Sequence, residues 1–257
     1  MRQRELRAGR PSFSTACKRD CPSKCASSTG VCSTEITRSG KNSCSTARRV
    51  ARLLQLLLEN HHQQMQDLLS RQPAAGAASV DLTGELPRLL RELEPALRSD
   101  GAVALAVQVL DTLSEATQGH ASLANSERLQ RDKALPVLSR LLSNALPAHS
   151  CTPAAVLELR RAAATLALSL LEGGTEFKLR TLARMARAFN VPAIRFELDD
   201  MLRANAHAAR CEQTGKPIRR GAHASDTFRG TYTPSTSAPL LYFTLLSSLG
   251  EYEAAAD

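Results

Sequence analysis

Leucine and alanine recur at helical spacing from Ser45 to about Thr214, and this pattern constrains the fold more than any other feature. Both residue types are strong helix formers. Residues that favour strands are scarce, because aromatic side chains make up only 4% of the sequence and Trp is absent. The sequence therefore predicts an all-α fold.

Proline, glycine and short polar stretches divide this pattern into separate helices. The first is expected to run for about six turns from Ser45, its N-cap, to Leu69, with a buried stripe that includes Val50 and Leu53. The second is expected to begin beside Pro87. Further helices are predicted over residues 103–117, 127–133, 134–145 and 154–172, and two more follow from Thr175 and Pro192.

Two parts of this helical body repeat. The segment Glu85–Leu90 is similar to Ala134–Leu142, with the two prolines 49 residues apart, and residues 106–113 are similar to residues 163–170. Residues 162–171 are apolar on all sides, as in a helix that neighbours cover on several faces. Stacked helix pairs would supply those neighbours.

The pattern A-L-P-x-L-x-x-L-L-S from Ala134, followed after a loop by the run from Val156 to Leu171, resembles an armadillo repeat. The resemblance extends over about residues 84–205. Lys133 stands where that family commonly has Gly, and these units are longer than the usual ~40–47 residues. The resemblance implies an armadillo-like α-solenoid that binds a partner, and a plain helical bundle is the alternative.

We expect three regions: a basic Cys/Ser-rich arm over residues 1–45, a helical repeat domain over residues 46–212, and a flexible tail over residues 213–257. Residues 1–49 hold eleven Lys or Arg and three Asp or Glu. The net charge of this segment, +8, equals the net charge of the whole chain. Because the arm has few aliphatic residues, it is predicted to be disordered. The expected location is the cytoplasm; the alternative is mitochondrial import, because the arm is rich in Arg and Ser.

Four cysteines of the arm are weak candidates for a zinc site: Cys17, Cys21, Cys25 and Cys32. Their spacing matches no standard zinc pattern, because a second close pair is missing. We therefore predict no metal site.

The sequence offers no enzymatic constellation. It has no Gly-rich phosphate loop, no nucleophile elbow and no zinc helix of the HExxH type. No apolar run approaches the ~20 residues that a membrane-spanning helix needs. We therefore expect no catalytic residue, no cofactor and no membrane span.

A basic ridge is the candidate binding surface. Arg180, Arg184 and Arg187 recur at helical spacing with Lys178 nearby, either as a solvated face or as a surface for an acidic partner. The predicted function is a protein–protein interaction scaffold or adaptor. The alternative is an organelle-imported assembly or RNA-associated factor that uses the arm and this ridge, although nucleic acid is not favoured.

One apolar segment, residues 240–249, interrupts the predicted flexible tail. It could dock on the helical body as a short helix or insert into a groove of a partner. We favour docking on the body.

Overall fold

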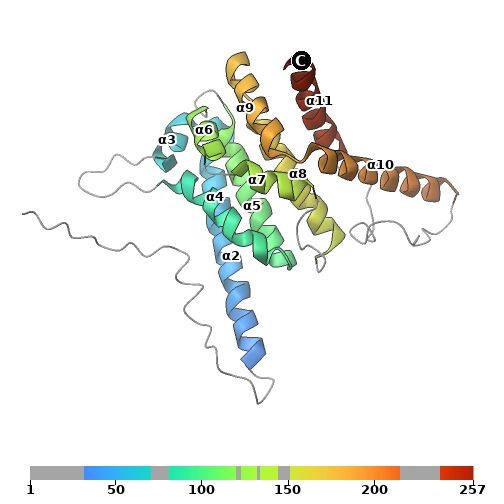
Figure 1. Cartoon of the computed structure of the whole chain (residues 1–257). Helices are drawn as coiled ribbons and strands as arrows, with labels where there is room; N and C mark the ends of the chain where they lie inside the picture. The colour runs from blue at the N-terminus through green and yellow to red at the C-terminus, as the bar shows by residue number, and fades with distance from the viewer. Residues whose placement is uncertain are drawn as a thin grey trace, which may run out of the picture. The chain divides into compact units, whose positions relative to one another are not determined.

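The computed structural model describes residues 32–70, 81–119, 123–131, 134–143, 151–214 and 238–256 (Figure 1). These residues form ten α-helices and two short 3-10 helices, with no strand among them. The all-α prediction is therefore confirmed for the described part of the chain. None of the described helices is long and apolar enough to cross a membrane.

The helices are α2 (Cys32–Leu58), α3 (Gln63–Ser70), α4 (Leu82–Leu93), α5 (Asp100–Thr117), α6 (Leu123–Arg131), α7 (Ala134–Leu142), α8 (Pro153–Ser169), α9 (Thr175–Ala188), α10 (Val191–Thr214) and α11 (Ala238–Ala256), with the 3-10 helices η1 (Glu59–His61) and η2 (Glu94–Ala96). The chain divides into two compact units, residues 1–40 and residues 41–257. Of the first unit only residues 32–40 are described, as the beginning of α2. The core and the contacts that follow belong to the second unit.

Side chains cap several of these helices. Asp81, Ser99 and Thr152 each accept a hydrogen bond from a backbone N–H in the first turn of α4, α5 and α8, as residues of these types commonly do. Pro153 is the first residue of α8, where its missing N–H costs nothing, as the sequence predicted. The predicted start of α4 beside Pro87 was wrong, because Asp81 caps the helix and Pro87 lies inside it.

The first predicted helix is two helices in the structure. Its predicted N-cap at Ser45 was wrong, because Ser45 lies within α2. α2 ends at Leu58, and Asn60 takes a left-handed backbone conformation (φ 64°), which Asn tolerates better than most residues. Leu69 of α3 then packs with Leu58 and with Ala116 of α5. The break at Asn60 therefore brings α3 against the end of α5.

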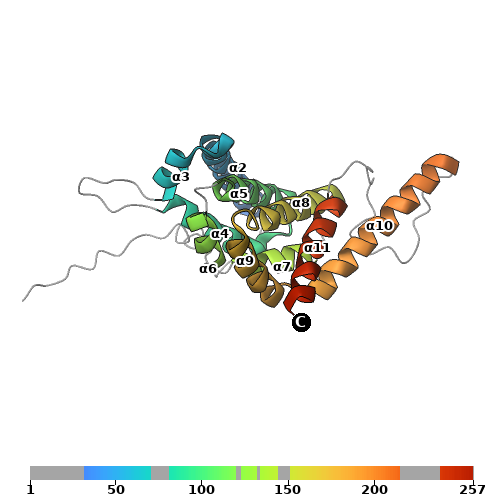
Figure 2. The same ribbon diagram turned by 90° about the horizontal axis from the view of Figure 1, so that it is seen from above.

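α5 and α8 lie side by side in the centre of the core (Figures 1 and 2). Within the predicted buried stretch 162–171, five residues of α8 are completely buried, namely Ala162, Ala163, Ala164, Leu166 and Ala167, and Thr165 and Leu168 are partly buried. The hydroxyls of Thr117 and Ser169, one on each helix, share a buried hydrogen bond of 2.9 Å. Small residues thus allow the two central helices to pack closely, and the hydroxyls of Thr117 and Ser169 satisfy each other.

The helices make contacts in a regular order. α4 contacts α5, and α7 contacts α8, so that two contacting pairs follow one another along the chain. The first helices of the two pairs, α4 and α7, are also in contact, and so are the second helices, α5 and α8. Arg140 of α7 adds an ion pair to Glu94 of η2, with Nη2 2.7 Å from Oε2, and this hydrogen-bonded pair raises the pKa of Arg140.

α11 packs against α8, α9 and α10 (Figure 1), and the apolar segment 240–249 lies within it. Tyr242 is completely buried, and its hydroxyl donates a hydrogen bond of 2.9 Å to the carbonyl of Leu142 at the end of α7. The prediction that this segment docks on the helical body is therefore confirmed.

A buried ion pair lies near Tyr242 and connects α8 with α10. Arg160 Nη1 is 3.0 Å from Glu197 Oε2, and the two side chains are only 1% and 8% exposed. Burial raises the pKa of Tyr242; the charge of Arg160 lowers it and that of Glu197 raises it. This pair was not predictable from the residue types, because Arg160 stands beside an equally basic Arg161 that is partly exposed.

Candidate partner-binding groove

The outer face of α2 carries three exposed aliphatic residues. Val50, Leu53 and Leu56 are 53%, 56% and 47% exposed, whereas Ala51 is buried. Thr112 of α5 donates a hydrogen bond from its Oγ1 to the carbonyl of Ala51 at 3.0 Å, so the face with the small residue meets α5. The predicted buried stripe through Val50 and Leu53 was therefore wrong.

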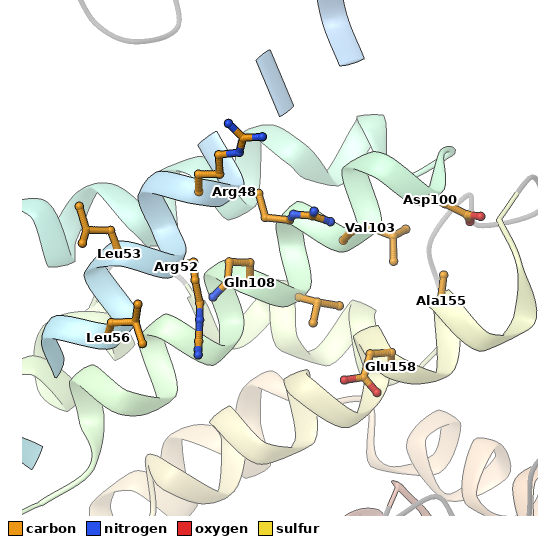
Figure 3. A pocket seen from close by; sticks show the side chains of 12 residues that line it. Arg48, Arg52, Leu53, Leu56, Asp100, Val103, Gln108, Ala155 and Glu158 are labelled. Atoms are coloured by element: carbon orange, nitrogen blue, oxygen red, sulfur yellow. The ribbon is translucent and has the colours of Figure 1, made fainter. Parts of the chain in front are cut away.

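A groove of about 650 Å³ lies between α2, α5 and the beginning of α8 (Figure 3). Val103 and Val107 of α5 and Ala155 of α8 contribute apolar surface to it, and Leu53 and Leu56 line its α2 side. None of the described residues that line it is aromatic. We refer to it as the α2–α5–α8 groove.

Charged side chains stand on both sides of the groove. Arg48 and Arg49 line the α2 side; both are exposed, and among the described residues neither has a side-chain hydrogen bond or ion pair. Asp100 and Glu158 line the other side (Figure 3). Asp100 Oδ1 accepts a hydrogen bond of 2.9 Å from the backbone N–H before α8, and Glu158 accepts one of 2.7 Å from Arg161. On the α2 side of the described groove, the charge that lacks a counter-ion is therefore positive.

Arg52 also lines the groove, but its guanidinium contacts residues that follow it in the chain. Its Nη1 donates a hydrogen bond of 2.6 Å to Gln55 Oε1 and lies 3.4 Å from Glu59 Oε1. Gln108 of α5 donates its Nε2 to the same Gln55 oxygen at 2.7 Å. These contacts connect α2 to α5 and hold Arg52 against its own helix.

Asp111 of α5 completes the electrostatics beside the groove. Burial raises its pKa, and Arg161, whose Nη2 lies 3.5 Å from Asp111 Oδ1, partly opposes that rise. Arg161 also bonds Glu158, and this hydrogen bond raises the pKa of Arg161. One guanidinium is thus shared by two carboxylates beside the groove.

The predicted basic ridge lies on α9, away from the residues that line the groove. Lys178, Arg180, Arg184 and Arg187 are all exposed, while Phe177, Thr181, Leu182 and Met185 of the same helix are buried. Arg184 Nη1 donates a hydrogen bond of 2.7 Å to Gln130 Oε1 of α6, so this residue connects two helices.

The four cysteines proposed for zinc are not tested by the structure. Cys17, Cys21 and Cys25 lie outside the described residues, as does the stretch that suggested mitochondrial import. Cys32 is the first residue of α2, and its side chain is also outside the description. Among the side chains that are described, no three His, Cys, Asp or Glu residues gather closely enough to hold a metal ion.

The sequence signal for the groove was present but was assigned elsewhere. Arg48 and Arg49 were counted with the charge of the arm, whereas both belong to α2 in the second unit. Leu53 was placed in the core, because α2 carries leucines on more than one face and the spacing alone does not show which face a neighbour covers.

Residues 41–142 match the family RIH_assoc, described as RyR and IP3R Homology associated. The match begins within α2 and ends with α7, so it covers the α2 and α5 sides of the groove and stops before α8. This similarity is to an all-helical domain family and agrees with the helical fold. Comparisons with curated proteins and with solved structures gave no match.

Proposed function

We propose that this chain is a non-enzymatic interaction domain that holds a helical segment of a partner protein in the α2–α5–α8 groove. The exposure of Leu53 and Leu56 beside apolar groove surface is the observation that carries the proposal. An amphipathic helix would cover both leucines with its own apolar stripe, which is a common mode of peptide recognition.

The length of the groove fits such an occupant. Asp100 and Gln108 of α5 both line it, and eight positions on a helix correspond to about 12 Å at a rise of 1.5 Å per residue. This length accommodates about two turns of a bound helix. The occupant would therefore present apolar residues at positions i, i+4 and i+7.

The proposal includes an armadillo-like arrangement of the helix pairs. In stacked repeats each helix contacts its counterpart in the next unit. The contacts of α4 with α7 and of α5 with α8 have this form, and the repeated prolines Pro87 and Pro136 lie in α4 and α7. The groove would then be a surface that stacked helices present, as the resemblance to armadillo repeats implies.

A selection experiment tests the proposed function. A displayed library of helical peptides would be selected on the full chain, and the affinities of the enriched peptides measured on wild type and on Leu53→Glu. We expect a loss of at least about tenfold, because the substitution places a charge in the apolar contact. Leu179→Glu is the matched control, because Leu179 is 47% exposed on α9, outside the groove. Peptides that bind Leu53→Glu as tightly as wild type would refute the groove as the binding site.

A further inference from the structure

The described arginines on the α2 side of the groove, Arg48 and Arg49, specify the occupant more closely. We propose that the α2–α5–α8 groove binds an acidic amphipathic helix, whose apolar stripe covers Leu53 and Leu56 and whose carboxylates pair with Arg48 and Arg49. This inference rests on the proposed function and adds the chemistry of the partner to it.

The positions on α2 support this pairing. Arg49, Leu53 and Leu56 stand at i, i+4 and i+7, so they share one stripe along the helix. A partner helix that lies along this stripe meets the arginine at one end and the leucines at the other. Arg48 adds a second exposed guanidinium beside the first. Guanidinium groups bind carboxylates through two parallel hydrogen bonds, so acidic residues at one end of the partner helix complement this surface.

The other side of the groove does not reverse this preference. Asp100 and Glu158 are acidic, but they line the side opposite Arg48 and Arg49, and Glu158 is already paired with Arg161. Arg52 is likewise engaged with Gln55. Among the described residues on the α2 side, the guanidinium groups of Arg48 and Arg49 therefore remain to be paired when the groove is filled.

The same features disfavour other occupants. The N-terminal arm is basic, so Arg48 and Arg49 would repel it. A second copy of α2 in parallel orientation would bring the same arginines against each other. RNA is disfavoured because none of the described residues that line the groove is aromatic and able to stack on bases.

Three synthetic peptides with one leucine stripe test the inference. They differ only in the flanking residues, which are Glu, Gln or Lys, and their binding to the full chain is measured by fluorescence anisotropy. We expect the Glu peptide to bind about tenfold tighter than the Gln peptide and the Lys peptide to bind most weakly, with a preference that weakens at high salt.

Charge reversal in the groove should invert the order of the peptides. In the variant Arg48→Glu/Arg49→Glu we expect the Lys peptide to bind most tightly. The matched control is Arg180→Glu/Arg187→Glu, which makes the same charge change on exposed residues of α9 and should keep the original order. An unchanged order in the groove variant would overturn the inference.

The remaining outcomes separate this inference from the proposed function. Equal binding of all three peptides, lost in Leu53→Glu, would overturn the acidic preference and leave the helix-binding groove in place. If no peptide binds, both are overturned. Binding of an RNA oligonucleotide that disappears in Arg48→Glu/Arg49→Glu, with no peptide bound, would replace the acidic helix with nucleic acid.

Discussion

Removal of one partner from the buried pair of Arg160 and Glu197 should strongly destabilise the fold. The two side chains are 1% and 8% exposed, and their charged atoms lie 3.0 Å apart. With an effective dielectric constant of about 20, Coulomb's law gives an attraction of about 5 kcal/mol at that distance. The desolvation of two ions, several kcal/mol each, offsets most of this gain, so the intact pair is close to neutral.

The single and double variants should therefore behave very differently. Arg160→Met and Glu197→Leu should each destabilise the fold by about 3–5 kcal/mol, because each leaves one buried charge without this counter-ion. The double variant should unfold near the stability of the wild type, since it removes both charges and supplies apolar side chains. The double-mutant cycle should thus show strong non-additivity.

Urea unfolding followed by far-ultraviolet circular dichroism measures these values, since the chain has no Trp for fluorescence. The control pair is Arg88 and Glu85, 2.8 Å apart on α4 and about half exposed, where the same substitutions should change stability by at most about 1 kcal/mol. Additive single effects, or single effects as small as those of the control pair, would refute the reasoning about the buried pair.

Three further predictions concern the core and the groove. Tyr242→Phe should lower the free energy of unfolding by about 1–3 kcal/mol, because the carbonyl of Leu142 loses its buried hydrogen-bond donor. The Tm should fall accordingly, and an unchanged Tm would contradict this prediction. Leu166→Asp should lower the free energy of unfolding, measured in urea, by about 4 kcal/mol or more, because it places a charge in the core. Leu179→Asp, at an exposed position, should lower it by about 0.5 kcal/mol or less, and equal losses would contradict the burial of Leu166. Burial raises the pKa of Asp111 above its ordinary 3.8, because ionisation costs more free energy in the folded chain than in the unfolded chain. The contribution of Asp111 to the free energy of unfolding therefore falls as the pH rises from below 3.8 through the raised pKa. Asp111→Asn should remove that decline, as measured by urea unfolding at several pH values across this range. The same dependence of stability on pH in wild type and variant would contradict the reasoning.

Part of the candidate groove was visible in the sequence. The residues Arg48, Arg49 and Leu53 stand out as basic and apolar, and helical spacing places Arg49 and Leu53 on one face. Their exposure was not predictable, because it depends on α5 contacting Ala51 on another face of α2. The groove itself required the approach of α2, α5 and α8, which are distant in the sequence.

The sequence by itself determined the helical character of this chain and several helix boundaries. Leucine and alanine at helical spacing, and Pro153 at the start of α8, act through local backbone preferences that do not depend on distant residues. Only the tertiary structure decided which faces are buried, that Asn60 separates two helices, and that Arg160 meets Glu197 inside the core. The physical reason is that burial and charge pairing depend on which distant helix covers a given face, and periodicity records only which residues share that face.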